Sequence, residues 1–281
     1  MKVLVTGVKG QLGHDVVKEL HLRGIECIGV DIEEFDVTDA KAVAAFISDY
    51  RPDVVMHCAA YTAVDKAEEN PELCRAVNAK GTRNIALVCK KIDAKMIYIS
   101  TDYVFTGSGD REYEVDDPTG PLGIYGHTKL EGEIAVRELM DKYFIVRISW
   151  VFGKNGNNFV KTMLRLGKER SEVNVVCDQI GSPTYTADLA PLLCDMMVTE
   201  KYGVYHATNE GYCSWAEFAQ EIFKQAGYRV KVNHIPTSEY PTRAKRPLNS
   251  RMSKRSLDEA GLRRLPNWKD AVGRYLGEIE A

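Results

Sequence analysis

The 281-residue sequence lacks several features that define other classes of protein. No apolar run approaches the roughly 18 residues of a membrane-spanning helix. The apolar start, Met1 to Thr6, is too short for the core of a signal peptide. A formal net charge of −3 gives no general electrostatic reason to expect nucleic acid or an anionic membrane as partner. We therefore expect a cytoplasmic protein that binds neither.

Cysteine is present without any organised pattern. The seven cysteines are odd in number, form no C-x-x-C pair and are not accompanied by clustered histidines. This pattern favours reduced cysteines that serve as small core residues, and it predicts no cysteine-based metal site. Internal repeats, low-complexity tracts and flexible linkers are also lacking.

The first half of the chain alternates short β-branched runs with helical patterns. The expected strands are 2–6, 26–30, 53–58, 95–100 and 144–149, and the expected helices are 11–22, 39–50, 71–91 and 125–142. Repeated β-α-β units with near-continuous apolar strands predict a parallel sheet covered by helices on both faces. With right-handed crossovers, this is the α/β doubly wound (Rossmann) fold.

The residue composition and the length of the expected elements change after residue 106. Residues 106–124 are rich in Gly, Asp and Pro and are expected to form a loop, and from about residue 151 the elements become shorter. We predict a dinucleotide-binding domain over 1–150 and a smaller C-terminal substrate-binding lobe over 151–281, partly interleaved with the first.

A glycine-rich loop follows the first strand and opens the first helix. Gly7 permits a tight turn, Gly10 lets the backbone approach a pyrophosphate, and Gly13 permits close packing of helix on sheet. The N-terminus of the helix, with Gln11 and Leu12, offers unpaired N–H groups and a partial positive charge to phosphates. The spacing is G-x-x-G-x-x-G rather than G-x-G-x-x-G, so the strand–turn–helix context carries the prediction.

An acidic residue ends the second strand. Asp31 lies 18 residues after Gly13, where a carboxylate accepts hydrogen bonds from the ribose 2′-OH of an adenosine. Such a residue favours NADH by repelling a 2′-phosphate, whereas Lys9 in the loop would partly offset that effect, so both NADH and NADPH stay open. The other residues expected to contact the cofactor are Asp36, Val37, Ala59, Ala60, Tyr61 and Ser100.

Tyr125 and Lys129 are four residues apart on an expected helix and therefore share one face. A free tyrosine, with a pKa near ~10, is a slow acid at neutral pH, and a nearby ammonium group lowers that pKa by stabilising the phenolate. Thr101 ends the fourth strand, at the sheet edge where such folds bind ligands, and is expected to hydrogen-bond a substrate carbonyl beside Tyr125. These three residues predict a catalytic group for carbonyl reduction with a nicotinamide.

The sequence resembles the extended short-chain dehydrogenase/reductases and, among them, the dTDP-4-dehydrorhamnose reductases, which complete dTDP-L-rhamnose synthesis. The glycine loop and the Tyr/Lys pair indicate only the superfamily, and other runs are more specific. The matching stretches are 7–13, 58–68, 100–105, 125–129, 149–152, 157–159, 178–184 and 246–250.

The resemblance implies roles for individual residues. Tyr125 would donate a proton to the 4-keto oxygen of the sugar, Lys129 would also hold the nicotinamide ribose, and Thr101 would complete the triad. The residues implied to contact the nucleotide-sugar substrate are Val64, Thr101, Asp102, Tyr103, Trp150, Asn158, Gln179, Arg243 and Arg246. The last four would lie towards the thymidine diphosphate.

Two alternatives remain open from the sequence. One is another enzyme of the superfamily, a nucleotide-sugar epimerase or dehydratase. Those tend to have longer substrate lobes, and dehydratases need an added acid–base pair that Asp102-Tyr103 does not match. The other is a non-catalytic subunit like the regulatory subunit of methionine adenosyltransferase. Some relatives are dimers with bound Mg²⁺, but no ligand spacing here indicates Mg²⁺, and both a monomer and a homodimer are compatible with the sequence.

Overall fold

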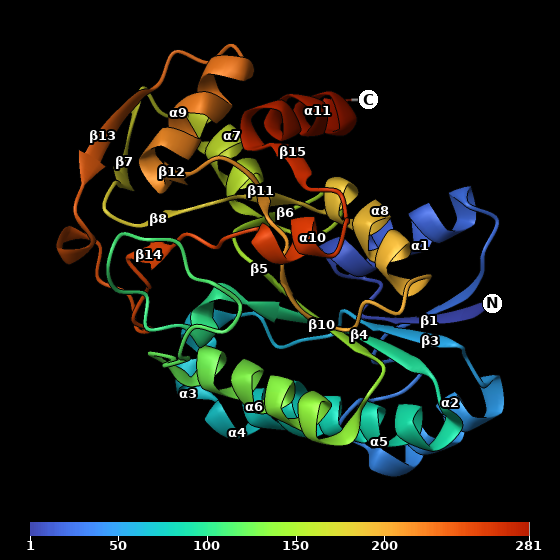
Figure 1. Ribbon diagram of the computed structural model, residues 1–281. Helices are drawn as coiled ribbons and strands as arrows, with labels where there is room; N and C mark the ends of the chain where they lie inside the picture. The colour runs from blue at the N-terminus through green and yellow to red at the C-terminus, as the bar shows by residue number, and fades with distance from the viewer. Residues whose placement is uncertain (281) are drawn as a thin grey trace.

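A six-stranded parallel sheet forms the centre of the protein in the computed structural model, which describes residues 1–280 (Figure 1). Its strands are β1 (Lys2–Thr6), β2 (Glu26–Val30), β3 (Val54–His57), β4 (Lys95–Thr101), β5 (Tyr143–Ile148) and β10 (Gly203–His206). Their order is β10-β5-β4-β3-β1-β2. The strand order therefore reverses between β1 and β3, which in open α/β sheets is where ligands bind. The predicted doubly wound fold is confirmed.

Helices cover both faces of this sheet. On one face lie α1 (Gln11–Leu22) and α8 (Thr186–Met197), and on the other lie α2 (Ala40–Tyr50), α5 (Thr82–Ile92) and α6 (Ile124–Leu139) (Figure 1). Successive side chains of a strand point to opposite faces. Accordingly Val3 and Val5 of β1 pack with α1 and α8, whereas Leu4 packs with α2 and α5.

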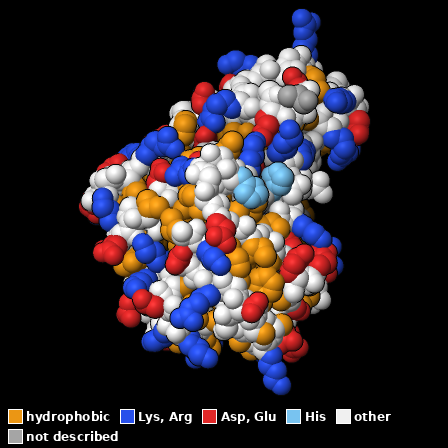
Figure 2. Space-filling view, turned by 90° about the vertical axis from the view of Figure 1, so that its right-hand side faces the viewer, with side chains coloured by type: hydrophobic (Ala, Val, Ile, Leu, Met, Phe, Trp, Pro, Cys, Tyr) orange, Lys and Arg blue, Asp and Glu red, His pale blue; other side chains and the backbone are white. Residues whose placement is uncertain are grey.

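The outer surface mixes charges of both signs. On the face seen from the right of Figure 1, Lys and Arg side chains are interspersed with Asp and Glu (Figure 2). Leu22 and Ile32 are among the few large apolar side chains that are well exposed. No helix in residues 1–280 is long and apolar enough to cross a membrane.

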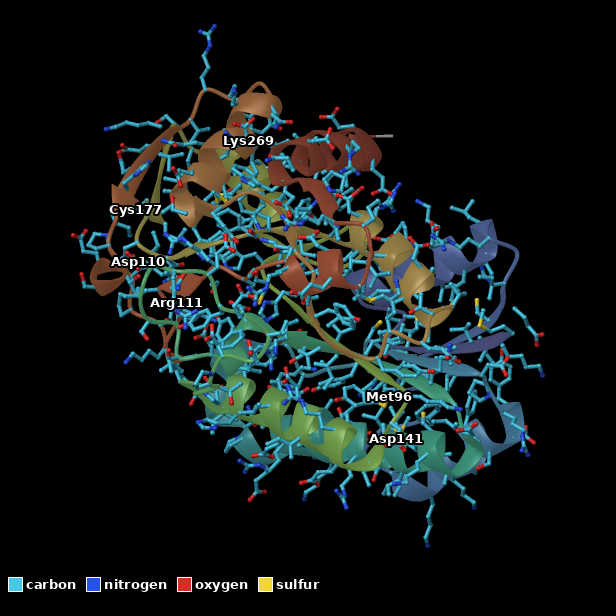
Figure 3. All side chains as sticks on the ribbon, in the orientation of Figure 1. Met96, Asp110, Arg111, Asp141, Cys177 and Lys269 are labelled. Atoms are coloured by element: carbon cyan, nitrogen blue, oxygen red, sulfur yellow. The ribbon has the colours of Figure 1, made fainter. Side chains whose placement is uncertain are left out.

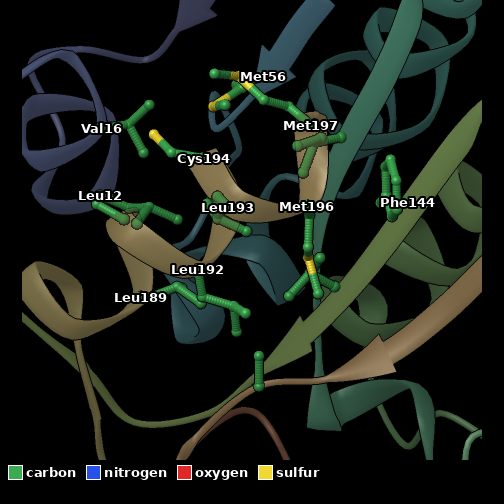
Figure 4. Close-up of a cluster of buried hydrophobic side chains, with 14 of the residues drawn as sticks. Leu12, Val16, Met56, Phe144, Leu189, Leu192, Leu193, Cys194, Met196 and Met197 are labelled. Carbon is green, nitrogen blue, oxygen red and sulfur yellow. The ribbon is translucent and has the colours of Figure 1, made fainter. Parts of the chain in front are cut away.

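Side chains fill the space between the layers (Figure 3). Met96 of β4, labelled there, is fully buried in the cluster shared with α5 and α6. On the opposite face, Leu12 and Val16 of α1 meet Leu193 and Cys194 of α8 above the sheet (Figure 4). All seven cysteines are free, and four are buried.

The helix expected over 71–91 is not continuous. It consists of α4 (Pro71–Arg75), a π-helical segment Ala76–Gly81, and α5. Wide turns of this kind are common at functional sites. Here the π segment contains Asn78, whose amide accepts from the Tyr61 N–H at 2.8 Å and donates to the Tyr61 carbonyl at 3.1 Å. The interruption thus ties the helix to the loop that follows β3.

The C-terminal part builds a second core. Its helices are α7 (Phe159–Glu169), α9 (Trp215–Gln225) and α11 (Trp268–Glu280). They pack around Phe152, and Phe218 of α9 lies in the same cluster. Strands β7 (Glu172–Val176) and β13 (Lys231–Ile235) pair at its edge. In contrast, α8 and β10 return to the large sheet, so the chain passes between the two cores more than once (Figure 1). A boundary at residue 150 stays a prediction.

The remaining elements are short. They are α3 (Val64–Glu69), β6 (Val151–Phe152), β8 (Ile180–Gly181), β9 (Thr184–Tyr185), β11 (Asn209–Glu210), β12 (Cys213–Ser214), β14 (Asn249–Ser250), α10 (Arg255–Glu259) and β15 (Leu265–Asn267). Strand β14 pairs in parallel with β8, and its Ser250 lies close to the C-terminal end of β4.

Candidate active site

A cavity of about 810 Å³ opens at the C-terminal ends of β1, β3 and β4, where the strand order reverses. Every residue predicted to bind the cofactor lines it. These are Gly7, Gly10, Gln11, Leu12, Gly13, Asp31, Asp36, Val37, Ala59, Ala60, Tyr61, Ser100, Tyr125 and Lys129. The predicted substrate residues Val64, Thr101, Asp102, Tyr103 and Trp150 line the same cavity.

The glycine loop is tightly packed. Gly7 has a φ of 73°, a left-handed conformation that favours glycine, and its N–H donates to the Val30 carbonyl at 2.9 Å. A Cβ on Gly13 would lie 2.4 Å from the Gly7 carbonyl oxygen, and one on Gly7 would lie 2.7 Å from Ala59. Gly7 and Gly13 thus let the loop pack closely against its own backbone and against the end of β3, which is the arrangement of a dinucleotide-binding turn.

Asp31 holds the glycine loop from the end of β2. Its carboxylate accepts from the backbone N–H of Lys9 at 2.9 Å and from that of Ile32 at 2.9 Å. The Lys9 ammonium pairs with Glu33 rather than with Asp31. Lys9 thus has a carboxylate partner of its own, and its effect on the charge of Asp31 stays a prediction.

The three predicted catalytic residues meet in the cavity. Thr101 ends β4, and Tyr125 and Lys129 lie in the first half of α6. Burial raises the pKa of Tyr125 above its ordinary value, and the nearby Thr101 hydroxyl opposes that rise. Desolvation of the phenolate outweighs the favourable contacts, and the lowering of this pKa by Lys129 stays a prediction.

Lys129 is almost fully buried and lies over the ring of Tyr98, with Nζ 4.1 Å from the ring centre. Burial lowers the pKa of Lys129 to about 7, and the buried carboxylate of Glu133, one turn along α6, opposes that shift. Glu133 is itself held by Arg147 of β5, through hydrogen bonds of 2.8 and 2.7 Å, and by Ser100 at 2.6 Å. This network fixes α6 against β4 and β5.

The Thr101 hydroxyl donates to Asp102 Oδ1 at 2.9 Å, and Ser250 of β14 donates to the other carboxylate oxygen. A threonine hydroxyl carries one proton. While that proton goes to Asp102, Thr101 Oγ1 only accepts, as it does from the Tyr103 N–H at 3.2 Å. In this arrangement Thr101 does not have a proton to give to a carbonyl oxygen. Burial raises the pKa of Asp102 to about 6, and Ser250 opposes the rise.

Aromatic rings form part of the cavity wall. The indoles of Trp150 and Trp215 stack with centroids 3.8 Å apart and planes 15° apart. Trp150 has a φ of 51°, unusual for a non-glycine residue and found where the surroundings enforce it. Tyr103 packs edge-on to Tyr125 with centroids 5.4 Å apart. These flat surfaces suit the apolar face of a deoxysugar.

Two residues implied to face the substrate do not line the cavity. The Asn158 amide donates to Gln11, to the Gly153 carbonyl and to Tyr275, and its oxygen caps α7 at the Lys161 N–H. Its hydrogen-bonding capacity is therefore used within the fold, while the neighbouring Asn157 lines the cavity. Gln179 is buried and donates to Thr237 at 3.1 Å.

Arg243 and Arg246 also lie outside the cavity wall, paired with acidic residues of α3. Arg243 pairs with Glu69. Arg246 pairs with Asp65 and donates to the Tyr103 hydroxyl at 3.1 Å. Tyr103 lines the cavity, so Arg246 lies just behind its wall.

Several wall residues have no role predicted from the sequence. They are Thr6, Val30, Ile32, Phe35, Thr62, Val77, Ile99, Ile148, Ser149, Val151, Gly156, Asn157 and Trp215. Trp215 is the most prominent. The run Ser214-Trp215-Ala216-Glu217 is a capping box, which places Trp215 at the start of α9. The sequence does not indicate that the N-terminal end of α9 faces the cavity, and the structure places it there. In residues 1–280, no group of three or more His, Cys, Asp or Glu side chains is placed to hold a metal ion.

A doubly wound sheet, a glycine loop at its switch point and a Thr/Tyr/Lys group at the adjacent strand end together define a short-chain dehydrogenase/reductase of the extended type. Comparisons with known proteins place the chain more narrowly. It matches the family described as RmlD substrate binding domain over residues 1–281.

Relatives agree along nearly the whole chain. The spore coat polysaccharide biosynthesis protein SpsK of Bacillus subtilis is 40% identical over 99% of this chain and 97% of its own. Solved structures of dTDP-4-dehydrorhamnose reductases include that from Clostridium acetobutylicum, 42% identical with a TM-score of 0.98 over 100% of both chains. Another, from Bacillus anthracis in complex with NADP, is 44% identical with a TM-score of 0.96 over 99% of both chains. The chain belongs to the dTDP-4-dehydrorhamnose reductase family.

Proposed function

We propose that the protein reduces dTDP-4-dehydro-β-L-rhamnose to dTDP-L-rhamnose with NADH or NADPH. One observation carries this proposal: Thr101, Tyr125 and Lys129 meet on the wall of the cavity that the glycine loop also lines. A nucleotide cofactor on the loop and a sugar against the aromatic wall would then meet at Tyr125. When bound, the nicotinamide supplies the hydride for the C4 carbon.

Tyr125 is the proton donor in this proposal. A phenol with a raised pKa stays protonated at neutral pH, so it is ready to give its proton to the oxygen of C4. An alkoxide is a stronger base than a phenolate, so this transfer stays downhill despite the raised pKa. With the Thr101 proton committed to Asp102, Tyr125 is left as the hydroxyl of the pair that donates to the carbonyl.

Lys129 and Thr101 support that transfer from two sides. Lys129 supplies positive charge in a buried site, where it stabilises the phenolate that remains after the proton has left. The Thr101 oxygen, free to accept, holds a sugar hydroxyl in place. On the substrate side, Trp150, Tyr103 and Val64 would cover the sugar ring.

The decisive experiment is NAD(P)H oxidation on addition of freshly generated dTDP-4-dehydro-L-rhamnose. Turnover in the wild-type protein that is lost in Tyr125→Phe supports the proposal. No turnover with either cofactor would overturn it. Tightly retained NAD that does not exchange would favour an epimerase, and co-purification with a synthetase would favour a regulatory subunit.

For the cofactor, we propose a preference for NADH set by Asp31, which lines the cavity at the end of β2. The relative from Bacillus anthracis was solved with NADP, so both cofactors need to be compared. The ratio of NADH to NADPH turnover should shift towards NADPH by roughly tenfold in Asp31→Ala, as when one charge repulsion is removed. An unchanged ratio would count against this role.

The assembly and location of the protein are also open to direct measurement. We propose a monomer or a homodimer in the cytoplasm. Light scattering tests the assembly, and a higher oligomer would contradict it. Turnover measured in EDTA, with and without added Mg²⁺, tests whether the metal contributes.

A further inference from the structure

Residues 240–250, here called the strap, contact α3 and end with β14 (Figure 1). The strap is tied to α3 by charge. Asp65 and Glu69 are four residues apart, so they share a face of this helix. Arg246 pairs with Asp65, and Arg243 pairs with Glu69. The acidic helix and the basic strap therefore compensate each other.

The Asp65 carboxylate is bound by the strap in the way a phosphate is bound. One oxygen accepts from the Arg246 guanidinium, and the other accepts from the backbone N–H of Ala244 at 3.0 Å. A guanidinium together with a backbone N–H is a donor set that proteins use for phosphate groups. The strap thus forms an anion site, and a side chain of the protein takes that site.

This anion site adjoins the cavity. Val64 precedes Asp65 and lines the cavity, as does Tyr103, whose hydroxyl accepts from Arg246. The Tyr103 ring packs on Tyr125, so one ring separates Arg246 from the proposed proton donor. In a nucleotide sugar, the sugar ring separates the C4 ketone from the phosphate on C1. A substrate with its ketone at Tyr125 can therefore direct its diphosphate towards the strap.

We propose that Asp65 and Glu69 compete with the diphosphate of the nucleotide sugar for Arg246 and Arg243, so that substrate binding exchanges a carboxylate for a phosphate at the strap. This inference rests on the proposed function. As they stand, both arginines have a carboxylate partner, so a diphosphate gains their full charge only if those partners leave. The side chains of Asp65 and Glu69 are 43% and 41% exposed, so water can solvate them when they do.

The test is the affinity for dTDP, measured by calorimetry on the full-length protein. Asp65→Asn removes the charge but keeps an oxygen to accept from Ala244, and Glu69→Gln is the equivalent change at the second pair. Because half-exposed ion pairs are weak, we expect about a threefold lower Kd for each variant and about a tenfold lower Kd for the double variant. Arg246→Ala should weaken binding.

A matched control is Glu131→Gln, which breaks the ion pair with Arg75, where the side chains are 40% and 44% exposed. Its Kd for dTDP should equal that of the wild type. Weaker binding in Asp65→Asn would show that the carboxylate orients the arginine rather than competing, and unchanged binding would show that the arginine does not meet the diphosphate. Either result overturns the proposal.

Binding of dTDP by Glu69→Gln and turnover by the wild-type protein separate the possible explanations of a negative result. If Asp65→Asn lowers the melting temperature so far that binding cannot be measured, Glu69→Gln decides alone by the same criterion. Turnover of the wild-type protein separates this inference from the proposed function. Turnover without tighter dTDP binding in the variants rejects the exchange and leaves the reductase standing, whereas absence of both dTDP binding and turnover rejects both.

Discussion

The two sides of the cavity are built in different ways. On the cofactor side, the wall consists of consecutive strand ends and one loop of a single sheet, held largely by backbone hydrogen bonds and by glycines that leave no space for a side chain. On the substrate side, it consists of α3, Tyr103, Trp150 and Trp215. The strap contacts α3 and Tyr103 through side chains, and the two indoles stack on each other. The first side is fixed by local geometry, and the second depends on contacts between distant segments.

This difference means that the two sides should respond differently to substitution. A change on the cofactor side should alter cofactor binding or stability, and one on the substrate side should alter the KM for the sugar nucleotide. Tyr125 belongs to both, because it lies between Thr101 at the end of β4 and Tyr103 of the substrate wall.

The largest effect is expected for Tyr125→Phe, which removes the proposed proton donor and leaves the ring in place. Positioned proton transfer contributes about 10²- to 10⁴-fold to a rate, so kcat should fall by that factor. NAD(P)H oxidation measures it. Cofactor affinity, followed by fluorescence, should stay within about twofold of the wild type. A variant that keeps more than a tenth of the wild-type kcat would remove Tyr125 from the chemistry.

Next in size is Gly13→Ala on the cofactor side. Its Cβ would lie 2.4 Å from the Gly7 carbonyl oxygen and 2.8 Å from the Gly7 carbonyl carbon, so the loop backbone must move. Crowding of this kind costs about 1–3 kcal/mol. We expect a lower melting temperature and at least about tenfold weaker cofactor binding, with a smaller change in dTDP binding.

Gly277→Ala is the matched control for that substitution. Gly277 lies within α11, and nothing lies within 4 Å of a Cβ added there. Alanine is favoured over glycine in a helix by about 1 kcal/mol, so the melting temperature should stay the same or rise slightly. If both variants behave alike, the close packing of the glycine loop is not what holds the cofactor side.

The contrast between the sides also explains what the sequence could predict. The glycine loop and Asp31 lie at expected strand ends, and parallel strands bring their C-terminal ends to one edge, so the whole predicted cofactor set lines the cavity. Asn158 was implied by resemblance alone. Its position directly before a helix is a signal for an N-cap, and it serves as one.

Trp215 and the pairing of Arg246 with Asp65 depend on how the second core packs on the first. Their partners are 65 and 181 residues away in the sequence, and neither spacing nor residue type indicates such a contact. The π segment around Asn78 was missed for a related reason. The apolar pattern there suits a continuous helix, and the hydrogen bonds between Asn78 and Tyr61 that accompany the wider turn are tertiary.

A moderate effect is expected for Trp215→Ala on the substrate side. The stack with Trp150 holds both indoles, and aromatic pairs contribute about 0.5–1.5 kcal/mol beyond the area they bury. We expect the KM for the sugar nucleotide to rise about tenfold, with cofactor affinity unchanged. Trp215→Phe, which keeps a flat ring, should restore most of the affinity. A change in cofactor affinity instead would mean that Trp215 belongs to the other side.

The smallest effect concerns the hydrogen bond that joins the two sides, from Ser250 of the strap to Asp102 at the end of β4. Burial raises the pKa of Asp102 to about 6, and Ser250 opposes this because its hydroxyl donates to the charged carboxylate. Ser250→Ala removes the donor and leaves Thr101 on the other oxygen, so the pKa of Asp102 should rise by about half a unit. The charged form would then be lost at a higher pH than in the wild type.

Infrared difference spectra between pH 5 and 8 report the carboxyl group, and Asp102→Asn identifies its band. Ser182→Ala, which removes a buried hydroxyl that donates to the Gly211 carbonyl, should leave the titration unchanged. An unshifted pKa in Ser250→Ala would mean that the strap does not influence the charge beside Thr101, and that the two sides meet only at Tyr125.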